Sequence, residues 1–147
     1  MNRQTGILLC ILLIFSQSVL ALEWKRLIIG DHLKVKVEIA RTSAEQEMGL
    51  GGRDSVPEGT GMLFVYNAPG NRIFWMKGMS IPIDILWARN GQIVFIEHHV
   101  PPPSPLAGDR SLKRYGIGIR ADMVLELPAG YAVNHTISPG QSIRLIP

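Results

Sequence analysis

Cysteine is nearly absent from this chain of 147 residues, in which Cys10 is the only one. Cys10 lies inside an apolar N-terminal segment. A domain formed by the rest of the chain therefore has no disulfide, no thiol nucleophile and no thiolate metal site. Such a domain must be held together by packing alone, even in an oxidising compartment.

Long runs of like charge are also absent, because no five consecutive residues carry the same sign. The net charge of +3 therefore indicates a small basic excess rather than a basic patch, and we expect no nucleic-acid partner. No Gly-rich phosphate loop follows a predicted strand, which disfavours nucleotide binding. No Gly-x-Ser-x-Gly motif surrounds Ser104 or Ser111, which disfavours a serine nucleophile.

The N-terminal residues have the layout of a secretory signal. Arg3 is the only charge before Glu23, an apolar run covers residues 7–15, and Val19-Leu20-Ala21 offers small residues for cleavage. The run is shorter than the roughly 20 residues of a membrane span. The sequence therefore predicts a signal peptide over residues 1–21 and a periplasmic or secreted protein. An uncleaved anchor and a buried helix remain as alternatives.

Residues 22–147 are enough for a single globular domain with its own core. Losing Arg3 with the signal leaves 14 basic residues against 12 acidic ones, a net charge of +2. We expect the partner to be a small molecule, a glycan or an envelope protein, because an aromatic-cation segment stands beside an embedded carboxylate, as described below. No stable membrane span is expected after cleavage.

Most of this domain has the pattern of short strands. Residues 33–39 alternate between apolar and charged side chains, which is typical of a half-buried strand. Thr42 and Glu45 have the spacing of a capping box, so a helix is predicted to begin there and to end at Gly49. Asn90-Gly91 predicts a tight hairpin. One or two helical turns are expected over 129–134, and further strands over 62–66, 73–76, 83–88, 92–97, 123–127 and 142–146.

About seven short strands with one or two short helices predict a mainly β (α+β) domain. We expect a compact antiparallel barrel or two-sheet sandwich, because either would protect the strand edges of a chain without disulfides.

Two carboxylates stand alone in apolar strands, Asp84 within residues 81–87 and Glu126 within 123–128. A buried carboxylate without a partner costs several kcal/mol, so we expect each to be paired if it is buried. The candidate partners are Arg53, Arg72 and Lys77. Three interpretations stay open: a solvated strand face, a structural ion pair, or a functional pair with tuned pKa.

Phe74-Trp75-Met76-Lys77 combines large apolar groups with a cation. If this segment is a strand, Trp75 and Lys77 share the face opposite Phe74. They would then line a ligand groove or simply face solvent.

A metal site is not expected. His98 and His99 are neighbours on a predicted strand end, where adjacent side chains point to opposite faces. They cannot easily bind one ion together, so we expect neither a metal nor another cofactor.

Several blocks in order resemble the family called domain of unknown function 192: residues 45–50 with Arg53, Pro57, 61–64, 74–77, 81–86, Gly91, 101–102, 124–130 and 139–140. The resemblance covers nearly all of residues 22–147. It implies that Glu45, Arg53, Trp75, Lys77, Asp84 and Glu126 occupy motif positions of the family. The family has no accepted activity, so the resemblance implies a fold and a site but no reaction.

Two departures from the family pattern bear on ligand contacts. Gly78-Met79 stands where the family typically has Asn-Thr, and Gly51 where it typically has Met. A ligand contact made by the Asn-Thr pair in relatives would be lost here.

Two functions follow as hypotheses. The first is a non-enzymatic binding or accessory module of the cell envelope, with ligand-binding residues Arg53, Trp75, Lys77, Asp84 and Glu126 in a polar groove. The second is a hydrolase or lyase on envelope material, with Asp84 and Glu126 as base and acid. We favour the binding module because no known catalytic motif is present, and no catalytic residue is assigned.

Overall fold

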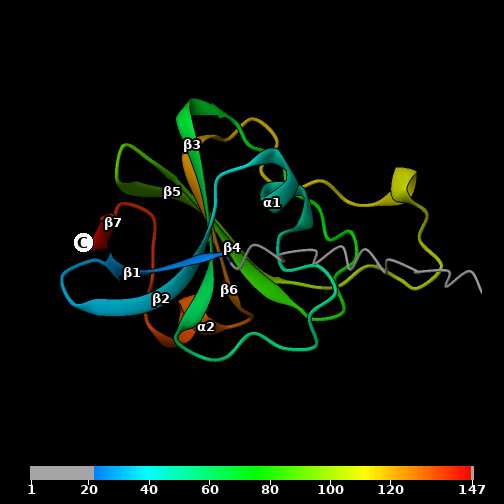
Figure 1. Cartoon of the computed structure of the whole chain (residues 1–147), viewed down its shortest axis with the longest axis horizontal. Helices are drawn as coiled ribbons and strands as arrows, with labels where there is room; N and C mark the ends of the chain where they lie inside the picture. The colour runs from blue at the N-terminus through cyan, green and yellow to red at the C-terminus, as the bar shows by residue number, and fades with distance from the viewer. Residues whose placement is uncertain (1–21, 147) are drawn as a thin grey trace, which may run out of the picture.

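In the computed structural model, which describes residues 22–146, seven strands form one curled sheet in the order β5-β4-β6-β3-β2-β1-β7 (Figure 1). The predicted signal peptide lies outside the described residues. The elements in chain order are β1 (Glu23–Ile29), β2 (Leu33–Ala40), α1 (Ser43–Met48), β3 (Thr60–Asn71), β4 (Ile83–Arg89), β5 (Gln92–Val100), the 3-10 turn η1 (Asp109–Ser111), β6 (Arg120–Pro128), α2 (Tyr131–Asn134) and β7 (Ile143–Ile146).

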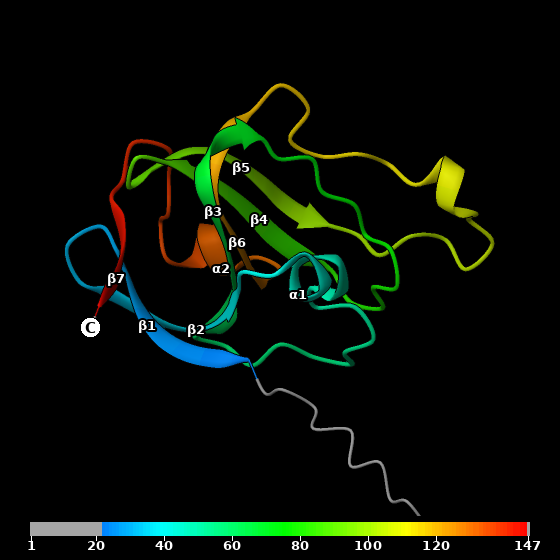
Figure 2. The same ribbon diagram turned by 45° about the horizontal axis from the view of Figure 1, so that its top comes forward.

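The sheet is a half-barrel whose two edge strands meet at one end (Figure 2). Neighbouring strands are antiparallel except for β2 and β3, which pair in parallel. At the meeting point the Ile93 N–H donates to Gln141 O (2.9 Å), and the Gly140 N–H donates to Ile93 O (2.8 Å). The predicted mainly β fold is confirmed.

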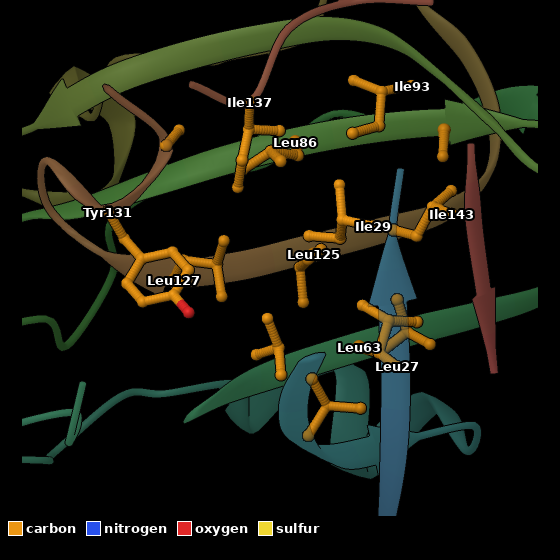
Figure 3. Close-up of a cluster of buried hydrophobic side chains, with 14 of the residues drawn as sticks. Leu27, Ile29, Leu63, Leu86, Ile93, Leu125, Leu127, Tyr131, Ile137 and Ile143 are labelled. Atoms are coloured by element: carbon orange, nitrogen blue, oxygen red, sulfur yellow. The ribbon is translucent and has the colours of Figure 1, made fainter. Parts of the chain in front are cut away.

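The inner face of the curl holds the first of two apolar cores (Figure 3). Because strand side chains alternate between faces, every strand contributes inward residues, among them Leu27, Leu63 and Leu125, which are fully buried. Tyr131 and Ala132 from α2 and Ile137 beyond it pack against the same cluster.

The second core lies on the outer face of β3, β6 and β4, around Phe64, Trp87 and Val124. The segment 72–79 crosses this face. Phe74 packs edge-on against Phe64, with ring centroids 4.8 Å apart, and against Trp87 at 5.9 Å.

The capping box predicted at Thr42 and Glu45 is confirmed, and it explains why α1 begins at Ser43. Thr42 Oγ1 accepts from the Glu45 N–H (3.2 Å), while Glu45 Oε2 accepts from the Thr42 N–H (2.9 Å). Gln46 Nε2 then donates to Val65 O (3.1 Å), which fixes the helix to β3. The C-terminal end of α1 is thereby placed over the outer core.

The Asn90-Gly91 hairpin is confirmed, with φ of 52° and 75° at the two residues. The strand predicted over 73–76 is wrong, because this segment forms only an isolated bridge between Phe74 and Tyr115. The Phe74 side chain of this segment packs onto the outer face of the sheet. Conversely, β1 was not predicted, since its polar first half hides the strand alternation.

Within the described range, no helix is long and apolar enough to cross a membrane.

Candidate functional site

A cavity of about 100 Å³ lies on the outer face, where the end of α1, the segment 72–79 and strands β3 and β6 come together. It is lined by residues 46–51, Phe64, Tyr66, residues 73–75, Lys77, Met79 and Glu126. The cavity therefore combines four of the blocks that carry the family resemblance, 45–50, 61–64, 74–77 and 124–130.

Glu126 is the buried acid of this cavity. Its side chain is 5% exposed, and its Oε2 atom has no hydrogen-bond partner within residues 22–146. Burial raises the pKa of Glu126 from 4.5 to about 8, although the nearby Arg53 lowers that pKa in part. At neutral pH the group is therefore mostly a protonated carboxyl, which can both donate and accept a hydrogen bond.

Gly49, just beyond α1, leaves room above this carboxyl. A Cβ atom at Gly49 would lie 3.9 Å from Glu126 Oε2 and 3.4 Å from the Phe64 ring. Its φ of 51° also favours glycine. The positive φ, rather than crowding, is therefore what favours glycine here, because an added Cβ would make only ordinary van der Waals contacts.

Arg53 lies beside the cavity and is held by a residue that the sequence did not single out. Its Nη1 is 2.6 Å from Glu38 Oε2. Glu38 and Glu126 flank Met62 in register across β2, β3 and β6, so all three share the outer face. The alternation of β2 predicted only a polar position at Glu38, and nothing in the sequence indicated its partner 15 residues away.

Trp75 and Lys77 line the mouth of the cavity, although not on a strand. Lys77 Nζ is 5.5 Å from the Trp75 ring centroid and 2.6 Å from Asp109 Oδ2. The hydrogen bond that Lys77 donates to Asp109 raises the pKa of Lys77. The Arg114 guanidinium lies 4.0 Å from the same ring. These contacts join the long loop over 101–114 to the segment 72–79 and give the mouth an aromatic group with two cations.

Met48 and Ile73 add exposed apolar surface to the same mouth, at 70% and 49% exposure. A ligand that reaches the Glu126 carboxyl would thus pass apolar and cationic groups on its way in.

Asp84 is fully buried, but it belongs to the opposite face of the sheet. In the pairing of β4 with β6, Ile85 is opposite Glu126, whereas Asp84 is opposite Leu127. Adjacent strand residues point to opposite faces, so the sheet separates the two carboxyl groups.

The partners of Asp84 are backbone N–H groups rather than the predicted cations. Oδ1 accepts from His99 (2.8 Å) and Gly130 (3.1 Å), and Oδ2 accepts from Ala132 (2.9 Å). Asp84 therefore joins the end of β5 to the start of α2. Arg72, another predicted partner, instead donates to the carbonyls of Ala68 and Ala121.

The structure thus gathers Arg53, Trp75, Lys77 and Glu126 on the outer face and leaves Asp84 on the inner one. Across residues 22–146, no three His, Cys, Asp or Glu side chains gather as a metal site.

Comparisons with known proteins agree with this fold. The model of the DUF192 family, described as an uncharacterized ACR, matches residues 26–145. A solved protein of unknown function from Novosphingobium aromaticivorans DSM 12444 is 27% identical, with a TM-score of 0.74 over 86% of this chain and 89% of that one. A protein described as a proposed transcription regulator from Sinorhizobium meliloti 1021 is 25% identical, with a TM-score of 0.73 over 85% and 95%. No curated protein matches the chain.

Proposed function

The chain belongs to the DUF192 family, and we propose that it is a non-enzymatic binding module that holds a small polar ligand in the cavity under α1. The observation that carries this proposal is the unpaired, buried Oε2 of Glu126 at that cavity. A buried polar atom without a partner costs about 1–3 kcal/mol. Such a cost is common where a group is kept for function, because a bound ligand can supply the missing partner.

The chemistry of the cavity selects an uncharged polar group. A protonated Glu126 carboxyl complements an amide or a hydroxyl, each of which can donate and accept. Arg114 at the Trp75 ring disfavours a cationic ligand, whereas Lys77 is already paired with Asp109. The volume of about 100 Å³ holds several water molecules or one small group of a larger ligand. An amide or hydroxyl of a small molecule, a glycan or an envelope protein fits these limits.

The alternative function, a hydrolase or lyase with Asp84 and Glu126 as base and acid, gains no support from this geometry. Both groups would have to reach the same substrate bond, yet they point to opposite faces of the sheet. In addition, both Asp84 oxygens already accept backbone hydrogen bonds.

The proposed place of action is outside the cytoplasm, after removal of residues 1–21. We expect N-terminal sequencing of the protein recovered from a periplasmic or secreted fraction to begin at Leu22. Recovery of the intact chain from the membrane fraction would instead favour the uncleaved anchor.

The binding proposal is tested by ligand-observed NMR with a panel of monosaccharides, N-acetylated amino sugars and simple amides. We expect Glu126→Gln to keep the hits, because a neutral amide still donates and accepts. Glu126→Leu should weaken them at least about tenfold, the effect of one lost hydrogen bond worth about 1.5 kcal/mol. Glu58→Gln is the matched control, which should keep the hits, because Glu58 is an exposed acid outside the lining of this cavity.

Trp75→Ala probes the mouth of the cavity in the same assay. Loss of the ring removes a contact surface and the support of two cations, so weaker binding is expected. If Glu126→Leu and Trp75→Ala both bind every hit as tightly as the wild type, the ligand site lies elsewhere.

A further inference from the structure

Four basic side chains converge on the outer face of β7, β1 and β2, away from the cavity. Arg26 pairs in register with Lys36, while Lys34 and Arg144 flank Ile28 two residues further along. Paired strand residues share a face, and the neighbouring Leu27, Val35 and Leu145 point into the inner core. Arg26, Lys34, Lys36 and Arg144 therefore form one surface, called here the basic face.

The charge of the basic face is not compensated. The ion pairs found within residues 22–146 are Lys25–Glu23, Arg53–Glu38 and Lys77–Asp109, and none includes a residue of the basic face. Glu38, the acid on the same side of β2, is already bound to Arg53. The remainder of residues 22–147 has 10 basic residues against 12 acidic ones. Four of the 14 basic residues in residues 22–147 thus lie together on three neighbouring strands, a grouping that the sequence alone did not indicate.

An aromatic and an apolar side chain border the basic face. Trp24 is 44% exposed, and Lys36 Nζ lies 4.7 Å from its ring centroid. A shallow hollow of about 450 Å³ is lined by Trp24, Lys25, Arg26, Lys36 and Ile146. Tryptophan beside lysine and arginine is the combination that favours the headgroup region of a bilayer.

We propose that the basic face docks the protein on an anionic lipid surface, with Trp24 at the level of the headgroups. Charge complementarity carries this proposal, because each basic residue near such a surface contributes about 1 kcal/mol.

A lipid surface fits the basic face better than a nucleic acid does. The major groove of DNA accepts a helix or a two-stranded ribbon, whereas the basic face is the outer side of a curled sheet three strands wide. No helix among the described residues contributes a side chain to it.

The test is co-sedimentation of the full chain with phosphatidylglycerol-containing vesicles and with pure phosphatidylcholine vesicles. A retained N-terminal apolar segment would bind both, so the preference for anionic vesicles reports the basic face. We expect Lys34→Gln with Lys36→Gln to lower that preference roughly 30-fold, at about 1 kcal/mol for each lysine. The matched control is Arg89→Gln with Arg110→Gln, which removes two exposed charges outside the basic face and should change the preference little.

Two readouts separate the basic face from a general charge effect. Binding of the wild type should weaken when the salt concentration rises, and its tryptophan fluorescence should shift to the blue on anionic vesicles but not in Trp24→Phe. Equal losses in both double variants, or equal binding to the two kinds of vesicle, would overturn the proposal. It would also fail if a DNA oligonucleotide displaced the vesicles and lost affinity in the same lysine variant. Thermal melting of each variant verifies that it is folded.

Discussion

Asp84 and Glu126 occupy neighbouring strands, and each interrupts an apolar sequence with a single carboxylate. Both are buried, with exposed fractions of 0% and 5%. On the inner face, Asp84 accepts hydrogen bonds from three backbone N–H groups. On the outer face, Glu126 keeps an oxygen without a partner and a pKa raised by burial to about 8.

The difference shows that a buried acid takes its role from the donors that the fold brings to it. Asp84 faces the start of α2 and the end of β5, where backbone N–H groups are free to donate. Glu126 faces the cavity below Gly49, where the nearest cation, Arg53, is already bound to Glu38. We interpret Asp84 as part of the architecture and Glu126 as the group held for a ligand.

Of the substitutions that test this difference, Asp84→Asn is expected to change the free energy of unfolding most. Asp84→Asn keeps one acceptor but turns an amide N–H toward the Ala132 N–H, and it removes the charge that strengthens all three hydrogen bonds. We expect the free energy of unfolding to fall by about 3–5 kcal/mol, of which about 1–3 kcal/mol comes from the unsatisfied Ala132 N–H and about 1 kcal/mol from each of the other two hydrogen bonds, which lose a charged acceptor. Urea unfolding measures this loss. A change below about 1 kcal/mol would contradict the architectural role.

The next effect is a gain of stability when Glu126 is replaced by glutamine, and the size of this gain depends on pH. Burial raises the pKa of Glu126 from 4.5 to about 8, so the folded state holds a proton that the unfolded chain releases near pH 4.5. The free energy of unfolding therefore falls as pH rises from 5 to 8, by about 1.4 kcal/mol per unit and roughly 3–4 kcal/mol in total.

Glu126→Gln should remove this dependence. We expect it to match the wild type near pH 5 and to be more stable than the wild type at pH 8, as measured by urea unfolding at both pH values. All other titrating groups are shared, so they cancel in the difference between the two proteins. Parallel pH profiles would mean that Glu126 is ionised in the folded state and has found a partner.

A smaller effect is expected at Gly130, which donates to Asp84 with a φ of 83°. A Cβ atom there would lie 3.2 Å from His99 Nε2. Gly130→Ala keeps the N–H donor, so we expect a loss of about 2 kcal/mol in urea unfolding, from backbone strain and the His99 contact. Gly59→Ala is the matched control, because Gly59 has a φ of 73° and open space around it. If both variants lose the same free energy of unfolding, backbone strain alone accounts for the loss, and the His99 contact contributes nothing.

Much of this fold could be predicted from local patterns. The capping box of Thr42 and Glu45, the Asn90-Gly91 turn and the alternation over 33–39 are short-range signals, and the structure confirms each of them. The segment 73–76 has the composition of a strand, but Phe74 packs onto Phe64 and Trp87, and only the rest of the fold could decide that.

The candidate site was less predictable for the same reason. The sequence singled out Asp84 and Glu126 together, but the register of β4 against β6 places them on opposite faces. Register depends on long-range pairing, which no local pattern reports. The partnership of Arg53 with Glu38 and the gathering of the basic face likewise require strands that are distant in sequence to lie side by side.

The smallest expected effect is the coupling free energy between the two carboxyl groups, which should be close to zero. Asp84 and Glu126 share no partner, so the stability changes of Asp84→Asn and Glu126→Gln should add to within about 0.5 kcal/mol in a double-mutant cycle at pH 8. Asp84→Asn with Gly130→Ala is the positive control, because those two residues share a hydrogen bond and should deviate from additivity. A coupling above about 1 kcal/mol between the two carboxyls would show that they act as one unit through the sheet. It would restore the paired role that their sequence pattern suggests and that their separate faces argue against.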